Sequence, residues 1–296
     1  MRLRGEIVFQ PMVYYRKRII VETTPIRVNT LVTDTDTLAE ALQAAGFETA
    51  RLAWCEEALT VRGASARALT ALPEYERGAF FIQNHSSLVP VLALAPQPEE
   101  AVLDLCAAPG GKTTHIAARL KNQGEIIAND ISQQRIYKLA NVLKQYAVTC
   151  ARTSRMPGHL IWQRYPDYFD GVLVDAPCSM RGTAEHSPSE VKSLAKQQKF
   201  LLKSALSAAK PGGTIVYSTC TTTVEENESV IAWLLEKHPG QVSVEPLNLP
   251  AVPFAPALTE DAKGRPFAEP IALTRRILPT AELEGFFVAK LRKTNR

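Results

Sequence analysis

From residue 101 onward, short apolar runs alternate with longer segments in which apolar residues recur at helical spacing. The apolar runs predict buried strands, because they are rich in Val, Ile and Leu and too short for helices. They lie at 101–105, 125–129, 171–174, 214–217 and 286–291. Helices are predicted at 114–121, at 134–145, from Ser187-Pro188-Ser189-Glu190 to Pro211-Gly212-Gly213, and at 225–238. Strands that alternate with helices in this way predict an α/β fold with a doubly wound sheet.

The first hundred residues follow a different pattern. Residues 26–31 predict a strand, and 48–62 hold one or two more. The segment from Thr37 to Glu40 has the spacing of a capping box, so a helix is expected there with Leu38 and Leu42 on its apolar side. Pro96-Gln97-Pro98 then interrupts the chain. We therefore expect a small α+β region at 1–75, followed by a larger domain at 76–296.

Composition adds constraints on the compartment and the partner. With 46% hydrophobic and 22% charged residues, the 296-residue chain resembles ordinary soluble globular proteins. No run approaches a membrane span and no secretion signal is apparent, so a cytoplasmic protein is expected. Five irregularly spaced cysteines without a C-x-x-C pair argue against a metal site and a disulfide framework. A net charge of +4 permits a nucleic-acid partner. We expect a monomer.

The loop after the first strand of the larger domain carries the first candidate chemistry. Residues 104–115 read DLCAAPGGKTTH, which is close to a phosphate-binding loop at Gly111, Lys112 and Thr113. Cys106 replaces that loop's first glycine, and Pro109 supplies no backbone amide.

A nucleoside cofactor without a triphosphate fits this loop better. Asp130 ends the next strand about 20 residues later, the spacing expected for an acid that holds ribose hydroxyls. S-adenosylmethionine is such a cofactor. A glycine-rich turn that binds no ligand stays open as an alternative.

Two further strands end in cysteine-containing turns, with the sequences DAPCS (175–179) and STCT (218–221). Carboxyl ends of parallel strands meet at one edge, so Cys178 and Cys220 are expected near the glycine-rich loop. A thiolate beside a methyl donor suggests addition to C6 of a pyrimidine, which makes C5 nucleophilic. Asp175 is suitably placed to stabilise the adduct. Either cysteine could be the nucleophile, and a buried cysteine is more commonly a small hydrophobic residue.

Several ordered motifs together resemble the RNA cytosine-C5 methyltransferase family, which includes bacterial ribosomal-RNA enzymes and the Nop2/Sun proteins. The motifs are a lead-in at 83–88, VLDLCAAPGGKTTHIA, Asp130 with Arg135, DAPCS-x-x-G to Gly182, YSTCT-x-x-x-EENE at 217–228, and the tail EGFFVAK at 284–290. They cover residues 80–291. The resemblance departs from the family at two places: Thr153 or Ser154 stands where an Asp is usual, and Asn84 stands where the lead-in has Asp.

The resemblance implies a Rossmann-like methyltransferase domain that uses S-adenosylmethionine and acts on tRNA or rRNA. It implies that Cys220 is the nucleophile, that Cys178 assists product release, and that Lys112 lies near cofactor and base. DNA cytosine methyltransferases use the Pro-Cys cysteine instead, which keeps Cys178 as second choice. The implied cofactor contacts are Cys106, Ala107, Ala108, Pro109, Gly110, Gly111, Lys112, Asp130, Arg135 and Asp175.

The resemblance also implies that the small front region, which has Arg27 and Asn29 in an R-x-N-T-L pattern, helps to grip RNA. A basic and aromatic cluster at 14–18 is a further candidate for phosphate contact. A non-catalytic RNA-binding or assembly factor that keeps the same fold is the alternative, and a nucleotide hydrolase is a weaker one.

Overall fold

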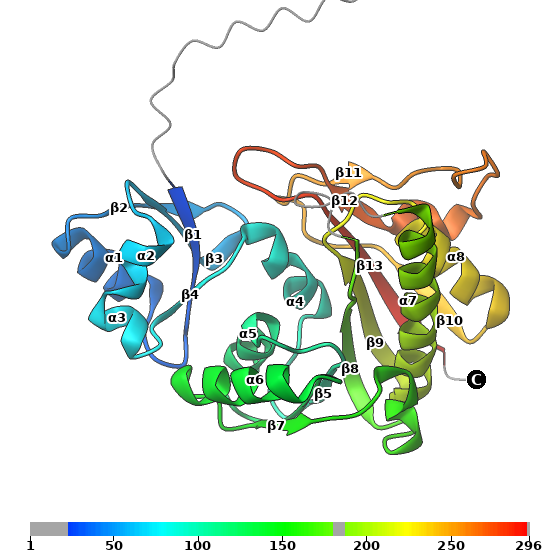
Figure 1. Ribbon diagram of the computed structural model, residues 1–296, viewed down its shortest axis with the longest axis horizontal. Coiled ribbons are helices and arrows are strands. Elements are labelled where there is room, and N and C mark those ends of the chain that lie inside the picture. The colour runs from blue at the N-terminus through cyan, green and yellow to red at the C-terminus, as the bar shows by residue number, and fades with distance from the viewer. Residues whose placement is uncertain (1–22, 180–186, 295–296) are drawn as a thin grey trace, which may run out of the picture.

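The computed structural model describes residues 23–179 and 187–294, which form two β-sheets with their helices (Figure 1). The smaller sheet lies at the front of the chain and is antiparallel, with strand order β2-β3-β1-β4. Its strands are β1 (Thr23–Val28), β2 (Glu48–Leu52), β3 (Cys55–Arg62) and β4 (Phe80–Ile82). The helices of this front unit are α1 (Thr35–Ala44), α2 (Ala66–Thr70) and α3 (Pro73–Glu76). The predicted strand region 48–62 thus contains two strands.

Two details of the front unit differ from the sequence predictions. The cap of α1 is Asp34, whose carboxylate accepts a hydrogen bond from the backbone N–H of Thr37, so the capping box predicted at Thr37 is wrong. An Asp three residues upstream competes successfully for the capping position. The front sheet also takes its fourth strand from Phe80–Ile82. The predicted division at residue 75 stays a prediction.

The larger sheet has nine strands within the described residues, in the order β11-β12-β13-β9-β8-β5-β6-β7, with β10 paired to β13. The five strands from β9 to β7 are parallel, and β13 joins them antiparallel. The strands are β5 (Ala101–Asp104), β6 (Glu125–Asn129), β7 (Ala151–Ser154), β8 (Phe169–Asp175), β9 (Ala209–Thr219), β10 (Val242–Glu245), β11 (Ala255–Pro256), β12 (Arg275–Ile277) and β13 (Phe286–Lys293).

Helices cover both faces of this sheet, as Figure 1 shows. Apolar side chains alternate along the strands: Leu103 faces a core shared with α7 and α8, whereas Val102 faces a second core shared with α4, α5 and α6. The helices are α4 (Val89–Leu94), α5 (Gly111–Arg119), α6 (Gln133–Gln145), α7 (Pro188–Ala208) and α8 (Glu228–Lys237), with short 3-10 helices η1 (His85–Leu88), η2 (Gly158–Gln163) and η3 (Glu269–Leu273). This arrangement confirms the predicted doubly wound α/β fold.

Helix boundaries follow local side-chain chemistry. Ser187 and Glu190 form the capping box that starts α7, as predicted. The α7 helix ends at Ala208, before Pro211, because the chain from Ala209 already belongs to β9. The α8 helix begins at Glu228 and not at 225. No helix in the described part of the chain is long and apolar enough to cross a membrane.

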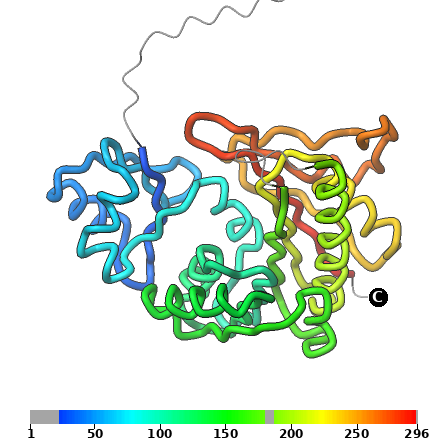
Figure 2. The backbone as a smooth tube through the Cα atoms, viewed as in Figure 1, coloured from blue at the N-terminus to red at the C-terminus, as the bar shows by residue number. Residues whose placement is uncertain are grey.

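The front unit packs against α5 and α6, whereas the C-terminal strands lie at the other end of the molecule (Figure 2). Buried hydrogen bonds join the two units at the end of α6. The side chain of Asn29 donates to the Tyr146 carbonyl oxygen (3.0 Å), and the Tyr146 hydroxyl donates to the Phe80 carbonyl (3.0 Å). Within the front unit, Asn29 also donates to the Gly78 carbonyl oxygen (2.9 Å). A Cβ atom on Gly78 would lie 2.2 Å from the Gln145 carbonyl oxygen. The backbones of Gly78 and Gln145 are therefore in direct contact.

Candidate active site

Two thiols meet at the carboxyl edge of the large sheet. Strands β8 and β9 are parallel neighbours with Asp175 opposite Ser218, so the turns that follow them leave the sheet side by side. Cys178 lies in the first turn and Cys220 in the second, both half-buried. Their Sγ atoms are 3.0 Å apart. The expectation that both cysteines reach one edge is therefore confirmed.

A carboxylate and an ammonium group lie beside the thiols. Asp175 accepts a hydrogen bond from the Ser218 hydroxyl at one oxygen (2.7 Å) and pairs with Lys112 Nζ at the other (2.7 Å). Lys112 stands in the first turn of α5, and its Nζ also lies 5.7 Å from the centre of the Phe286 ring. The ion pair thus connects the glycine-rich loop to the end of β8.

The resting site keeps Cys220 protonated. Its pKa is raised, first by the hydrogen bond with Cys178 and then by burial, with the negative charge of Asp175 adding to the effect. The positive charge of Lys112 acts in the opposite direction. A nucleophilic role for Cys220 would therefore require that the thiol first lose its proton.

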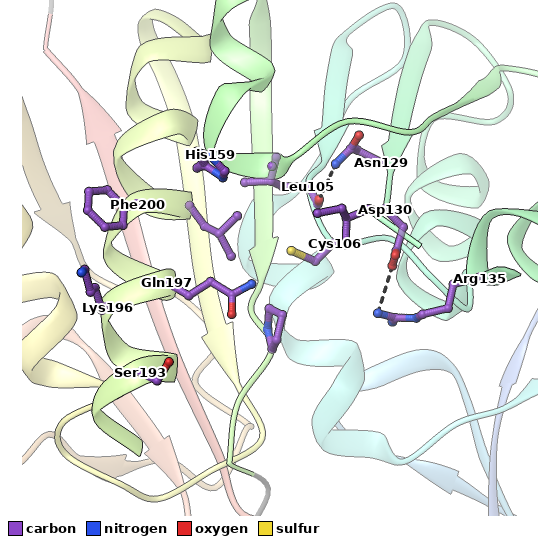
Figure 3. A pocket seen from close by; sticks show the side chains of 14 residues that line it. Leu105, Cys106, Asn129, Asp130, Arg135, His159, Ser193, Lys196, Gln197 and Phe200 are labelled. Carbon is purple, nitrogen blue, oxygen red and sulfur yellow. Dashed lines mark hydrogen bonds and ion pairs between the residues drawn. The ribbon is translucent and has the colours of Figure 1, made fainter. Parts of the chain in front are cut away.

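A cavity of about 500 Å³ opens between the glycine-rich loop and α7 (Figure 3). Asp130 lies on its wall, where its carboxylate accepts the Ser132 N–H (2.9 Å) and pairs with Arg135 (3.1 Å). Arg135 also donates to the Ala108 carbonyl, which ties the acid to the loop. The other lining residues are mostly apolar or carry uncharged polar groups: Leu105, Cys106, Asn129, Ile131, Gly158, His159, Pro177, Ser193, Gln197, Phe200 and Leu201, with Lys196 at α7. Apolar walls beside a fixed carboxylate suit a nucleoside.

A second cavity, of about 180 Å³, lies on the other side of Cys106 and includes Lys112 and Asp175 in its wall. Asp104 also lines it. One Asp104 oxygen accepts the Thr113 hydroxyl (2.7 Å), whereas Oδ1 is buried without a hydrogen-bond partner among the described residues. Burial raises the pKa of Asp104 to about 7. An unpartnered buried acceptor at this place suits a ligand with an ammonium group.

Asp104 was not predicted as a site residue. The signal in the sequence is a charged residue within an otherwise apolar strand, which is unusual unless the charge has a partner. From the sequence alone, however, it cannot be told which way the side chain of a strand-terminal residue faces.

The structure places the remaining candidates at different sites. Arg27 and Asn29 are fully buried, so neither side chain is exposed to RNA, whereas the RNA role of the front region as a whole stays a prediction. Arg27 instead donates to the Thr114 hydroxyl (2.7 Å) and lies 3.4 Å from the Gly111 carbonyl, at the start of α5.

The positions at which the sequence departs from the family lie away from the large cavity. Asn84 caps η1. Thr153 and Ser154 lie on β7 and are not among the residues that line the large cavity. The 14–18 cluster and Gly182 lie outside the described residues.

Comparisons with known proteins agree with this architecture. Residues 91–292 match the family model described as 16S rRNA methyltransferase RsmB/F. The Ribosomal RNA small subunit methyltransferase F of Klebsiella pneumoniae (strain 342) is 38% identical over 91% of this chain and 57% of its own length. Its counterpart from Escherichia coli O127:H6 is 37% identical over the same shares. The chain thus spans little more than half the length of these curated relatives.

Solved structures from Pyrococcus horikoshii are also similar. A methyltransferase homolog is 36% identical, with a TM-score of 0.82, over 92% of this chain and 87% of that chain. The structure titled NSun6 with SFG is 24% identical, with a TM-score of 0.78, over 93% and 92% of the two chains, and this likeness concerns the fold.

Proposed function

The chain belongs to the 16S rRNA methyltransferase RsmB/F family, and on this premise we propose that it methylates C5 of a cytosine in ribosomal RNA with S-adenosylmethionine as the methyl donor. The observation that carries the proposal is the meeting of two thiols, 3.0 Å apart, next to a nucleoside-sized cavity. Single-thiol sites can add to a pyrimidine, but a second thiol at this distance provides a separate group for the release step.

The residues present fit the cofactor. Asp130 would accept hydrogen bonds from the ribose hydroxyls, and the unpartnered Oδ1 of Asp104 would accept one from the ammonium group. Cys106 lines both cavities, and the loop that follows it, through Ala107, Ala108, Pro109, Gly111 and Lys112, lines the smaller one; these residues would contact the part of the cofactor between the ribose and the ammonium group. The cofactor supplies an electrophilic methyl group, which an activated C5 carbon accepts.

Cys220 activates that carbon. Its thiol loses a proton to solvent, and the thiolate adds to C6 of the cytosine, so that a C6–S bond forms and the C5–C6 double bond opens. The negative charge that spreads over the ring is stabilised by Lys112, which Asp175 holds beside the thiols. The target base must leave its stack to reach this edge of the sheet.

Cys178 completes the reaction. As a thiolate, it takes the proton from C5 of the methylated adduct, and it later gives this proton to solvent. The electron pair of the C5–H bond restores the C5–C6 double bond, and the C6–S bond breaks with its pair on Cys220. The products are 5-methylcytosine and S-adenosylhomocysteine.

The proposal is tested by replacing each thiol in turn. We expect Cys220→Ala to form neither 5-methylcytosine nor an adduct, and Cys178→Ala to accumulate a protein–RNA adduct that survives denaturing electrophoresis. Purified small ribosomal subunits or their naked RNA serve as substrate, with 5-methylcytosine measured by mass spectrometry. Cys150→Ala is the matched control, since Cys150 lies before β7, away from both thiols. An adduct in Cys220→Ala would reverse the roles, and a wild-type protein that binds RNA without methylating it would favour an assembly factor.

A further inference from the structure

Three consecutive residues at the start of α8 lie fully buried behind the two thiols. They are Glu226, Asn227 and Glu228, and each has 0% of its surface exposed. The residue Asn227 precedes the first turn of α8 but makes no side-chain hydrogen bond that caps it. Polar side chains at a helix start usually satisfy the free N–H groups of their own helix. Here they are directed to other segments, which calls for a different explanation.

Glu226 holds the turn that carries Cys178. One carboxylate oxygen accepts the Ser179 N–H (3.0 Å), and the other accepts the Ser179 hydroxyl. The first oxygen also accepts the side-chain amide of Gln198 (2.8 Å), which lies 2.8 Å from the Pro177 carbonyl as well. The residues on both sides of Cys178 are thus fixed through one carboxylate.

Asn227 holds the turn that carries Cys220. Its amide oxygen accepts the Thr219 hydroxyl (2.5 Å), and its amide nitrogen donates to the Thr221 carbonyl (2.9 Å). The residues on both sides of Cys220 are therefore fixed in the same way. Adjacent residues of one turn thus each hold a different thiol-bearing loop. Where the loops leave the sheet, the Ser218 carbonyl accepts the Ala176 N–H (2.9 Å) and the Ser218 hydroxyl donates to Asp175; farther out, the loops meet at the thiols and at the Ser179–Thr221 hydroxyl contact of 3.4 Å.

We propose that Glu226 and Asn227 are positioning residues that control separate steps of the reaction, Glu226 the release step through Cys178 and Asn227 the attack step through Cys220. This inference rests on the proposed function for its assignment of steps. The geometric part, that each residue fixes one thiol and not the other, stands independently of it. Buried polar groups of this kind place reacting atoms to within a fraction of an ångström.

Two near-isosteric substitutions separate the steps. Glu226→Gln removes the charge and leaves one acceptor oxygen for the three donors on Ser179 and Gln198, so the Cys178 turn is held less firmly while the Asn227 bonds remain. We expect steady-state turnover to fall about tenfold or more, a single-turnover methyl transfer rate within about threefold of wild type, and a higher fraction of covalent adduct.

Asn227→Asp places a carboxylate oxygen against the Thr221 carbonyl and so displaces the Cys220 turn. We expect the rate of adduct formation to fall about tenfold or more, with no accumulation of adduct. Glu225→Gln is the matched control, since it makes the same chemical change at a half-exposed neighbour. The control should retain the wild-type rates.

A second measurement does not depend on RNA chemistry. Iodoacetamide labelling, followed by peptide mass spectrometry, gives the alkylation rate of each thiol. Glu226→Gln should change the rate at Cys178 at least about threefold more than at Cys220, and Asn227→Asp should do the reverse. If the wild-type protein makes no 5-methylcytosine, the proposed function fails, whereas this labelling pattern still decides the positioning roles.

The inference is overturned if both variants change the two thiols equally, or if both slow attack and release by the same factor. Should Glu226→Gln fail to fold, Ser179→Ala gives a milder test, because it removes one donor to Glu226 and keeps the backbone bond. It should shift Cys178 labelling and adduct accumulation in the same direction. An unchanged labelling pattern in Ser179→Ala would also count against the proposal.

Discussion

The buried carboxyl of Asp104 makes the affinity for an ammonium-bearing ligand depend on pH. Its folded-state pKa of about 7 lies well above the ordinary 3.8, because burial disfavours the charged form. In the empty protein the group is therefore neutral below about pH 7 and ionised above it. An ammonium-bearing ligand binds better to the ionised form, since its positive charge offsets the cost of burial.

We predict that the affinity for S-adenosylhomocysteine rises up to about tenfold per pH unit as pH approaches 7 from below, and levels off above it. Isothermal titration calorimetry between pH 5.5 and 8.5 measures this directly. Asp104→Asn should bind more weakly at pH 8 and lose most of the slope. A variant that keeps the wild-type slope would place the titrating group elsewhere.

At this scale the sequence was informative about residue types and less so about their surroundings. Cys178, Cys220 and Asp175 could be assigned to one edge because strand ends can be recognised from apolar runs. The burial of Arg27 could not be predicted, because a basic residue in a short strand is expected to lie at the surface. Its side chain is buried because the front unit packs on α5, a contact between segments more than eighty residues apart.

At the scale of elements, the α8 helix is anchored to the far strands of the sheet. Arg276 on β12 donates to Glu228 through Nε (2.6 Å) and reaches the Thr222 carbonyl through Nη1 (2.8 Å). Both side chains of the ion pair are buried, with 6% and 0% exposed. Removing one partner leaves the other charge buried and uncompensated.

We predict that Arg276→Met lowers the free energy of unfolding by about 3–5 kcal/mol, the usual cost of breaking a buried pair. Urea denaturation followed by circular dichroism provides the measurement. Arg275→Met on the same strand should cost less than about 1 kcal/mol, because the bonds of the Arg275 side chain within the described ranges go to the nearby carbonyls of Ala272 and Thr274. Equal losses in the two variants would contradict the assignment.

Helix and strand positions can be predicted where the apolar pattern or a capping motif is clear. They are predicted poorly where buried side-chain hydrogen bonds decide the boundary. The capping box at Ser187 gave the start of α7. The start of α8 was placed three residues early, because Glu225 to Asn227 have the composition of a first helical turn. The side chain of Glu226 bonds to Ser179 and Gln198, which are distant in sequence, and that of Asn227 bonds to Thr219 and Thr221 in the preceding turn, so neither side chain caps the helix.

At the scale of the whole molecule, a buried histidine joins the front unit to α5. His115 Nε2 lies 2.9 Å from the Glu57 carboxylate on β3, and its Nδ1 has no hydrogen-bond partner within the described ranges. Burial lowers the pKa of His115 from 6.5 to about 4. The neutral ring therefore donates from Nε2 to Glu57, and a second proton on Nδ1 would be buried without an acceptor.

This arrangement makes the contact sensitive to acid. Because the folded-state pKa is below the unfolded one, the stabilisation is complete above pH 6.5 and is lost as pH falls toward about 4. We predict that wild-type protein loses about 3 kcal/mol more unfolding free energy over this window than His115→Gln does. Urea titrations at half-unit pH intervals give the comparison. Parallel curves for the two proteins would disprove the assignment.

The alternation of strands and helices was sufficient to predict the doubly wound sheet. It did not predict β7, the short strands β10 to β12 or the fourth front strand, Phe80–Ile82. Segments of two to four residues carry no readable periodicity, and they pair because neighbouring strands offer free backbone groups.

The contact between Gly78 and the end of α6 bears on attempts to build chimeric enzymes. A donor front region transplanted onto the large-sheet unit must present a glycine where Gly78 meets Gln145, and an amide side chain that reaches the Tyr146 carbonyl as Asn29 does. Grafts chosen by sequence boundaries alone would introduce a Cβ atom into occupied space. Exchange of front regions between relatives therefore requires that both sides of this contact be transferred together.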